Sequence, residues 1–282
     1  MNRVVLSDIR LGEKRAGHSG PVIRLILFGL FLAAAGLAYA RLWSPNLLFG
    51  PAHWPEALFL LLATATTLGW VAGQVPGQNM MLAGVVVAVV GGAAHTLDAM
   101  TGVPFGPCEF SEKIGERLFE PLPWAIPLVW LVAILNARGV SRLMLRPWRK
   151  GRNYGLWLIG LAVVLVVLFE LSLEPFAAKV QGYWSWKTTK LPLDWYTAPL
   201  VNFLAWGLVA GLILAFITPA LINKSPVKPA PSFQPLFVWL LVTGLFAAAE
   251  ARHQLWPAVW LTLGTDALAV LFVVVGTRSV VR

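Results

Sequence analysis

Charged residues are spread very unevenly along the chain, and long apolar runs separate them. No charged residue lies between Arg24 and Arg41, and none lies from Ala57 to Ala94. The second run is too long for a single membrane-spanning helix, which needs about 20 apolar residues. Its segment 73–79 contains glycines, a proline and amides, and glycine and proline interrupt helices. The apolar runs are continuous rather than alternating, so they predict helices and not the strands of a barrel.

The whole pattern predicts an all-α, polytopic transmembrane helix bundle that forms one membrane domain over residues 1–282. We expect a tail at 1–20 and about eight spans, at 21–43, 55–74, 80–99, 121–138, 154–176, 198–222, 234–250 and 256–276. The tripeptide Ala38-Tyr39-Ala40 is similar to a signal-peptidase site. The apolar run before it is long for a signal peptide, so an uncleaved first span is expected.

The composition agrees with this pattern. Hydrophobic residues make up 58% of the chain and charged residues 12%, whereas a soluble domain has about 25% charged residues. A soluble globular enzyme and a disordered chain are therefore excluded. Cys108 is the only cysteine, so the chain forms no intramolecular disulfide and no thiolate metal cluster of its own.

The net charge of +9 is explained by membrane topology. With eight spans and a cytoplasmic N-terminus, 15 of the 22 Lys and Arg residues fall on the cytoplasmic side, as the positive-inside rule requires. We therefore expect a multi-pass protein of the cell (inner) membrane with both termini in the cytoplasm. The basic hairpin Arg142–Arg152 then faces anionic lipid, and no nucleic-acid partner is expected.

Ionisable side chains inside spans are energetically unfavourable, so each is a functional candidate. The predicted spans contain His95, Asp98, Glu170, Glu174, Glu250 and Asp266. In the predicted topology, Asp266 alone lies near the middle of the membrane, and the others lie toward the outer face. Asp266 alone is typical of a hydrogen bond between helices. His95 fits either a packing residue or a proton donor, and one histidine with scattered carboxyl groups predicts no metal site.

Glu170 and Glu174 stand four residues apart and therefore share one helix face. Two carboxylates close together in a low dielectric repel each other, which favours the protonated form of one of them. A carboxylic acid that stays protonated at neutral pH can act as a general acid. The alternative is that both side chains reach headgroup water at the membrane interface.

The predicted outer loops are rich in proline, glycine and aromatic residues. The segment 101–107 is compact and stiff, and the segments 182–186 and 195–196 are aromatic. Such aromatics often form an interfacial belt. Here they flank the carboxyl groups in the sequence, and aromatic faces can also line an apolar groove and stabilise a cation.

Three ordered blocks of sequence carry a family resemblance. The first is Thr-Gly-Val-Pro-Phe-Gly at 101–106, followed by 118–130. The second is Glu-Leu-Ser-Leu-Glu-Pro at 170–175 with Gly-Tyr-Trp-Ser-Trp at 182–186, and the third is Pro-Leu-Val-Asn-Phe-Leu-Ala-Trp at 199–206. Over roughly 90–210, the chain resembles the carotenoid-biosynthesis membrane proteins that include the bacterioruberin-type and gamma-carotene end-group hydratases.

The resemblance implies a cofactor-free addition of water to the terminal double bond of an acyclic carotenoid. The expected partners are then a carotenoid or another long isoprenoid lipid, together with membrane lipid. The implied catalytic residues are Glu170, Glu174, Asp98 and His95, with one glutamate as the acid. The implied substrate-binding residues are Thr101, Pro104, Phe105, Tyr183, Trp184, Trp186, Asn202 and Trp206.

The chain departs from the family pattern at this implied site. The family usually has Asp where Glu170 and Glu174 stand. It tends to have Glu at the position of His95, Gly at that of Asp98, and Tyr at those of Cys108 and Phe110.

Two other functions remain open at this point. An isomerase or cyclase of isoprenoid ends also begins with protonation of an alkene. A lipid-binding or carotenoid-binding membrane protein, or a small transporter, needs no such step, although a transporter is expected to have helices broken near the membrane centre.

Overall fold

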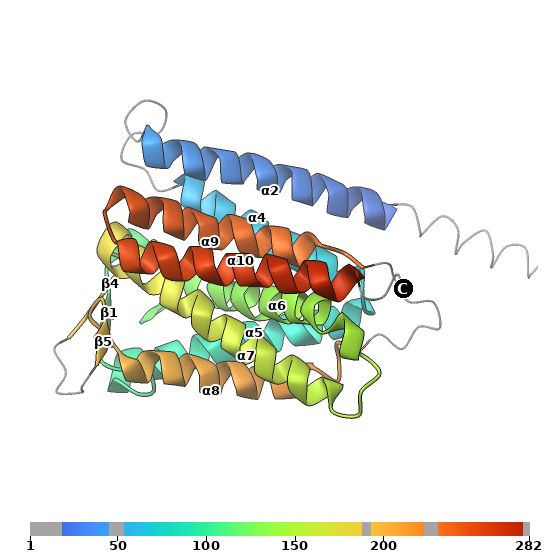
Figure 1. Ribbon diagram of the computed structural model, residues 1–282. Helices are drawn as coiled ribbons and strands as arrows, with labels where there is room; N and C mark the ends of the chain where they lie inside the picture. The colour runs from blue at the N-terminus through green and yellow to red at the C-terminus, as the bar shows by residue number, and fades with distance from the viewer. Residues whose placement is uncertain (1–18, 45–53, 188–192, 223–230, 279–282) are drawn as a thin grey trace, which may run out of the picture.

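The computed structural model describes residues 19–44, 54–187, 193–222 and 231–278. In this part of the chain, eight helices are long and apolar enough to cross a membrane, and they lie side by side in one bundle (Figure 1). The predicted all-α transmembrane fold is therefore confirmed. The helices are α2 Ser19–Trp43, α4 Trp54–Ala72, α5 Gly77–Thr101, α6 Ala125–Met144, α7 Tyr154–Glu174, α8 Leu200–Ile217, α9 Gln234–Arg252 and α10 Trp256–Arg278. The predicted tail at 1–20 lies outside the described residues up to position 18.

The predicted fourth span, at 121–138, is shifted toward the C-terminus in the structure. Pro121 and Pro123 precede α6 and belong to a tight hairpin. Proline has no backbone N–H to donate to the hydrogen bonds of a helix, so α6 begins after them. Arg138 does not end the helix, which continues to Met144. Its side chain is buried and donates a hydrogen bond of 3.2 Å from Nη2 to the carbonyl oxygen of Leu221.

Helix α6 is the centre of the bundle. It contacts α4, α5, α7, α9 and α10, and nearly all of its residues are buried. Small residues allow these close approaches. A Cβ on Gly139 would lie 2.6 Å from Pro235 of α9, and a Cβ on Gly91 of α5 would lie 2.4 Å from the Trp130 ring of α6.

Helices α2 and α8 lie at opposite edges of the bundle (Figure 1). Helix α2 packs on α4 and α9, and α8 packs on α7 and α5. Both carry large exposed apolar side chains, among them Leu25, Leu30, Leu204 and Phe216. Apolar surface of this extent suits lipid rather than water, and it identifies the chain as a multi-pass membrane protein.

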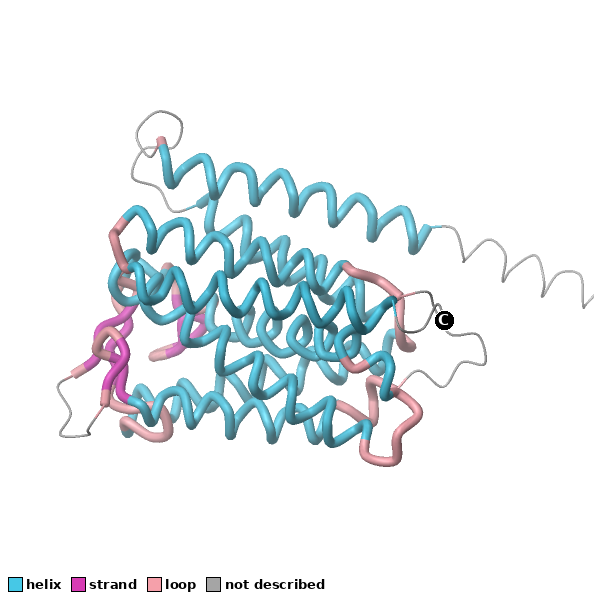
Figure 2. The backbone as a smooth tube through the Cα atoms, viewed as in Figure 1, coloured by secondary structure: helices cyan, strands magenta, loops and turns pink. Residues whose placement is uncertain are grey.

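Short strands gather at one end of the bundle, which we call the strand end (Figure 2). Strand β1, Cys108–Phe110, pairs antiparallel with β4, Trp184–Trp186, and places Cys108 opposite Trp186 and Phe110 opposite Trp184. Two further pairs are β2 Arg117–Phe119 with β3 Leu122–Pro123, and β5 Asp194–Trp195 with β6 Ala198–Pro199. The sequence predicts compact loops here but not these strands.

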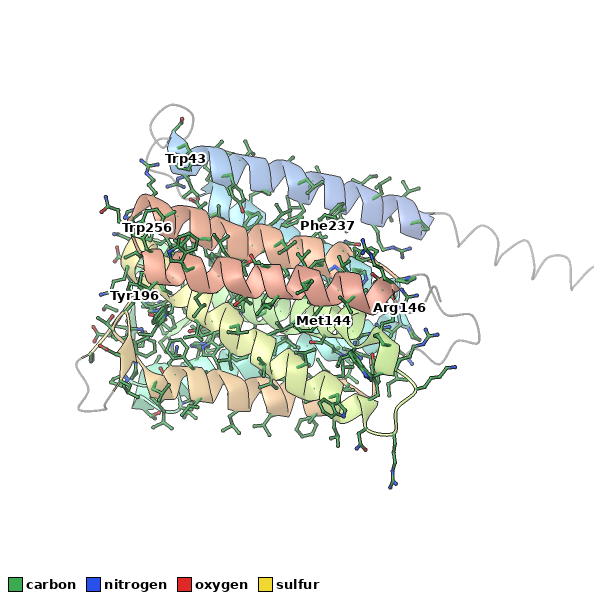
Figure 3. The ribbon with its side chains drawn as sticks, in the orientation of Figure 1. Trp43, Met144, Arg146, Tyr196, Phe237 and Trp256 are labelled. Atoms are coloured by element: carbon green, nitrogen blue, oxygen red, sulfur yellow. The ribbon has the colours of Figure 1, made fainter. Side chains whose placement is uncertain are left out.

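The opposite end of the bundle, where α2 begins and α10 ends, carries the loop between α6 and α7. We call it the basic end because of the Arg and Lys residues of that loop. In Figure 3, Arg146 at the basic end lies far from Tyr196 and Trp43 at the strand end.

Candidate active site

The two candidate glutamates lie where α7 changes its geometry. Pro175 lacks a backbone N–H and therefore disturbs the α-helical ladder, and residues Pro175–Gln181 form a π-helix, η3. Gly182 follows in the left-handed conformation, with φ of 65°, which suits a residue without a Cβ. The chain changes direction at Gly182 and continues as β4, which lies against the C-terminal end of α7.

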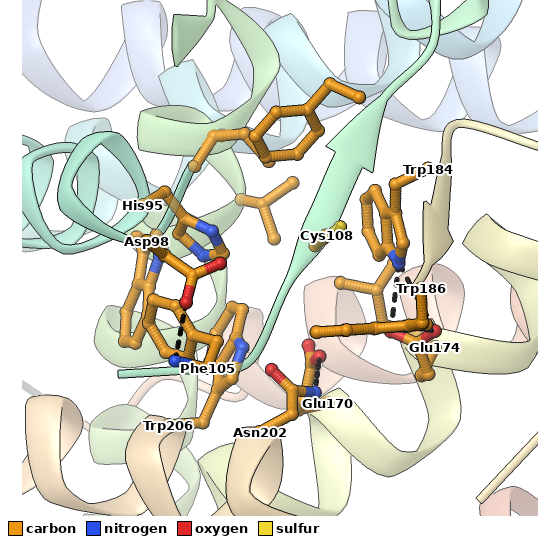
Figure 4. A pocket seen from close by; sticks show the side chains of 15 residues that line it. His95, Asp98, Phe105, Cys108, Glu170, Glu174, Trp184, Trp186, Asn202 and Trp206 are labelled. Atoms are coloured by element: carbon orange, nitrogen blue, oxygen red, sulfur yellow. Dashed lines mark hydrogen bonds between the residues drawn. The ribbon is translucent and has the colours of Figure 1, made fainter. Parts of the chain in front are cut away.

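Strand β4 covers Glu174 with two indole rings. Alternate residues of a strand face the same side, so Trp184 and Trp186 both face inward while Ser185 is exposed. Trp186 Nε1 donates to Glu174 Oε1 at 2.6 Å, and Trp184 Nε1 donates to Oε2 at 3.0 Å (Figure 4). Both oxygens of Glu174 therefore accept from donors that cannot accept in return.

Glu170 is only half satisfied. Asn202, near the start of α8, donates from Nδ2 to Glu170 Oε1 at 2.8 Å. Glu170 Oε2 is buried and has no hydrogen-bond partner. The side chains of Glu170 and Glu174 are 2% and 0% exposed. The interfacial alternative, in which both reach headgroup water, is therefore wrong.

Asp98 holds the turn that follows α5. Its Oδ1 accepts from the backbone N–H groups of Phe105 at 2.7 Å and Gly106 at 3.0 Å. Gly106 has φ of 113°, and a Cβ there would lie 2.9 Å from Pro199. The turn is thus fixed against the start of α8, and it directs the fully buried ring of Phe105 into the site.

Aromatic rings form the other walls. His95 stacks on Phe105 with ring centroids 4.3 Å apart, and Trp130 stacks on Trp206 at 3.8 Å. His95 Nε2 and the indole N–H groups of Trp130 and Trp206 are buried without a partner. Buried polar atoms are normally hydrogen-bonded, so unpaired atoms that share one cavity point to water or a ligand there.

These side chains enclose a cavity of about 30 Å³, which we call the acid cavity. This is room for one or two water molecules. Four of the twelve buried unpaired side-chain atoms in the described part of the chain belong to its walls. The lining residues are His95, Asp98, Phe105, Cys108, Phe110, Ile126, Val129, Trp130, Glu170, Leu173, Glu174, Trp184, Trp186, Asn202 and Trp206.

A larger apolar cavity of about 310 Å³ lies beside the acid cavity. The two cavities have four lining residues in common, Ile126, Val129, Leu173 and Trp184. The larger cavity extends between α4, α7 and α9, and its walls include Phe59, Phe169, Phe176, Tyr183, Leu245 and Phe246. Its volume falls in the range of small-molecule sites.

Most of the residues that the resemblance implies come together in these two cavities. Nine of them line the acid cavity, and Tyr183 lines the apolar cavity. Thr101 and Pro104 line neither. Thr101 is exposed, and its hydroxyl donates to the carbonyl oxygen of Leu97 at 2.7 Å, so it serves the end of α5.

Several lining residues are not among the implied catalytic and substrate-binding residues, although Cys108 and Phe110 stand at positions where the chain departs from the family pattern. Cys108 and Phe110 face inward with Trp184 and Trp186 because the strands pair, and Trp130 enters through its stack on Trp206. The Trp130 position could have been suspected, since it is the last residue of the block 118–130 that carries part of the resemblance. Burial raises the pKa of the Cys108 thiol, and the nearby Glu174 and Asp98 raise it further, so Cys108 lines the cavity as a neutral thiol.

Two other buried carboxyl groups lie outside the acid cavity. Asp266 of α10 accepts from Trp239 Nε1 at 3.0 Å and from the Thr243 hydroxyl at 2.9 Å, and it thereby links α10 to α9 as predicted. Glu250 is fully buried near the end of α9, and both of its oxygens lack a partner. In the described ranges, no three His, Cys, Asp or Glu residues are arranged to hold a metal ion.

Comparison with known proteins gives one match. A family model described as "Carotenoid biosynthesis protein" matches residues 56–270. This range includes nearly all of α4, the whole of α5 to α9, most of α10 and every residue of both cavities except Trp54. No curated protein and no solved structure matches the chain.

Proposed function

Because this chain belongs to the carotenoid biosynthesis protein family, we propose that it is a hydratase that works without a cofactor. In this proposal it adds water to the terminal double bond of an acyclic carotenoid end. The observation that carries the proposal is the pair of buried glutamates, one with an unpaired oxygen, in an aromatic cavity with room for water. Family membership supports the role in carotenoid biosynthesis, and the cavity supports the reaction type.

The two cavities match the shape of such a substrate. An isoprenoid chain is long and apolar, and the cavity of about 310 Å³ is lined mainly by apolar and aromatic side chains. We place the end of the polyene there, with its last double bond directed past Leu173 and Trp184 toward the acid cavity, whose space of about 30 Å³ is left for the water. Conjugated and aliphatic carbons then contact Phe169, Phe176 and Phe246.

The hydrogen bonds support Glu170 as the acid. Every partner of Glu174 is an N–H donor, and such donors stabilise a carboxylate over a carboxylic acid. Glu170 Oε2 has no donor to stabilise a charge, and the neighbouring negative charge of Glu174 disfavours a second one. One proton shared by the pair therefore resides on Glu170, at the oxygen that faces the cavity.

The chemistry then takes two steps. Glu170 gives its proton to the less substituted alkene carbon, and a tertiary carbocation forms while Glu170 becomes a carboxylate. Water adds to the cation and loses a proton to the Glu174 carboxylate, which leaves a tertiary alcohol. A transfer of that proton from Glu174 to Glu170 restores the starting state, so that the sum is the addition of one water.

The cavity walls suit the intermediate. The rings of Phe105, Trp184 and Trp186 surround the reacting position, and an aromatic face stabilises a desolvated cation by about 2 kcal/mol or more. We assign the water to the unpaired His95 Nε2 and to the indole N–H groups of Trp130 and Trp206. Asp98 is a positioning residue in this scheme, because its carboxylate is already engaged by the turn that carries Phe105.

The experiment is expression of the full chain in a lycopene-producing bacterium, followed by mass spectrometry of the extracted pigments. We expect products heavier than lycopene by one or two waters, and none with Glu170→Gln at equal protein level in the membrane fraction. If the pigments keep the mass of lycopene but differ from it in structure, the protein is an isomerase or a cyclase and not a hydratase. If lycopene and other acyclic carotenoids all remain unaltered, the result would favour the binding protein or the transporter.

We also propose that the strand end faces away from the cytoplasm and that the protein lies in the inner membrane. The excess of Lys and Arg at the opposite end supports this orientation. An alkaline phosphatase fused after Arg282 is expected to be inactive, and a fluorescent protein at the same place is expected to fold. The reverse result would invert the orientation and leave the chemistry unaffected.

A further inference from the structure

The basic end of the bundle contains a cavity that the proposed reaction does not use. Its volume is about 720 Å³, and it lies between the end of α6, the start of α7 and the segment after α8. Five cationic side chains line it: Arg138, Arg142, Arg146, Arg149 and Lys150. None of the described residues in its walls is acidic. We call it the basic cavity.

Arg138 is the deepest of these cations. Its side chain is 5% exposed, and Nη2 is bonded to the Leu221 carbonyl oxygen while Nε has no partner. No salt bridge among the described residues involves it. A buried charge is stable only when it is paired and hydrogen-bonded, so this guanidinium lacks its counter-charge.

The neighbours of Arg138 increase the need for an anion. Arg142 lies one turn further along α6 and repels Arg138 electrostatically. The helix dipole does not account for Arg138, because it lies more than one turn before the end of α6 at Met144 and the effect is confined to the last turn. Neither the topology rule nor the dipole explains why two arginines converge inside a cavity.

Other donors face the same space. The indole Nε1 of Trp70 and the hydroxyl of Thr218 belong to the cavity walls and are buried without a partner. Tyr154 and Gly155, the first residues of the 21-residue helix α7, also line it, and Asn153 before them makes no side-chain cap. The N–H of Tyr154 donates to the carbonyl oxygen of Gly151 at 3.1 Å, whereas the next N–H groups at the start of a helix lack internal partners and favour an anion.

We propose that the basic cavity binds a phosphate group, held by Arg138 and Arg142 and facing the start of α7. The donors suit phosphate, whose oxygens guanidinium groups bind in a bidentate manner as they do those of a carboxylate, and phosphate is the anionic group that a membrane surface supplies. An anionic phospholipid headgroup and a soluble phosphate ester both present this group. The position of the cavity at the end of a membrane bundle makes both sources accessible.

The test uses the full chain, purified in neutral detergent and delipidated. Binding is measured by native mass spectrometry and by thermal shift with phosphatidylglycerol, phosphatidylcholine or inorganic phosphate. Preference for phosphatidylglycerol with no response to phosphate identifies a lipid site. A comparable response to inorganic phosphate identifies a soluble ester. Either result supports the phosphate site.

Variants assign the binding to this cavity. Arg142→Gln and Arg146→Gln are each expected to weaken binding about fivefold, the effect of about one cation at a membrane surface, and Arg138→Gln about tenfold or more. The matched control is Arg152→Gln, which removes the same charge from the same loop but does not line the cavity. Because Arg142 and Arg146 are only half-buried, their variants keep the test valid even where Arg138→Gln fails to fold.

Two results would overturn the proposal. One is the absence of saturable binding of phosphatidylglycerol and of phosphate to the unaltered chain. The other is an equal loss of binding in Arg152→Gln and Arg142→Gln, which would show attraction to the general surface charge.

Discussion

Both ends of this bundle enclose polar groups, but they differ in whether the protein itself supplies partners for the buried charged group. At the strand end, Glu174 is held by two indole N–H groups inside a cavity of about 30 Å³. At the basic end, Arg138 faces a cavity of about 720 Å³ whose described walls contain no acid. The acid cavity supplies hydrogen-bond partners to both oxygens of Glu174 and leaves Glu170 Oε2 without one. At the basic end, no described residue supplies a counter-charge to Arg138, which suits a ligand that arrives from outside.

One helix serves both ends. Trp130 of α6 lines the acid cavity, and Arg138 of the same helix lines the basic cavity, about 12 Å further along at 1.5 Å per residue. The difference between the two regions is therefore testable in one protein, provided that each variant affects one end alone.

The largest effect is expected for Glu170→Gln. Glutamine keeps the size and the bond to Asn202 but cannot supply the proton, so turnover is expected to fall by about 10²–10⁴-fold. Product formation is measured by mass spectrometry in membranes with equal amounts of protein. Arg142→Gln at the other end serves as the control and is expected to keep turnover within about twofold of the unaltered chain. Equal losses in both variants would contradict the separation of the two ends.

The next effect concerns the bonds to Glu174. Trp186→Phe keeps an aromatic ring but removes the 2.6 Å bond to Oε1. A hydrogen bond to a charged group contributes about 1.5–3 kcal/mol, so turnover is expected to fall by about 10- to 100-fold. Trp195→Phe is the matched control, because its indole donates to the Leu171 carbonyl oxygen and does not line the acid cavity. Similar losses in both variants would show that only the loop structure matters.

A smaller effect is expected from packing. Gly91→Ala places a Cβ 2.4 Å from the Trp130 ring, whereas Gly84→Ala on the same helix meets Leu68 at an ordinary 3.4 Å. Overpacking costs about 1–3 kcal/mol, so the first variant is expected to lower the thermal unfolding temperature in detergent and to reduce turnover as the stack on Trp206 shifts. The second is expected to be neutral. Unchanged activity in Gly91→Ala would remove the Trp130 stack from the site.

The helices and much of the acid cavity could be predicted from the sequence, for local reasons. Continuous apolar runs identify the spans, and the spacing of four places Glu170 and Glu174 on one face. The resemblance adds Asn202, Trp184 and Trp186, which the structure brings to these glutamates. These features follow from residues close together in the sequence or from the pattern shared with the family.

The rest depends on contacts between distant segments. The pairing of β1 with β4 directs Cys108 and Phe110 inward, and nothing local to residues 108–110 predicts a partner at 184–186. The predicted span 121–138 ends at Arg138, whereas the structure buries this side chain within α6. Its burial depends on Leu221 and on a cavity formed by three separate segments, which no single apolar run shows.

The smallest effect tests what makes a buried carboxyl group functional. Asp266 lies in the middle of α10 and, unlike Glu170, has partners for both oxygens, in Trp239 and Thr243. Hydrogen bonds between membrane helices contribute about 0.6 kcal/mol on average, so Asp266→Asn is expected to lower stability by less than about 1 kcal/mol. Turnover is expected to stay within about twofold, because this carboxyl group lines neither cavity near the glutamates. A loss of turnover as large as that of Glu170→Gln, at unchanged unfolding temperature, would instead make Asp266 part of the proton's route and would extend the acid site toward the membrane centre.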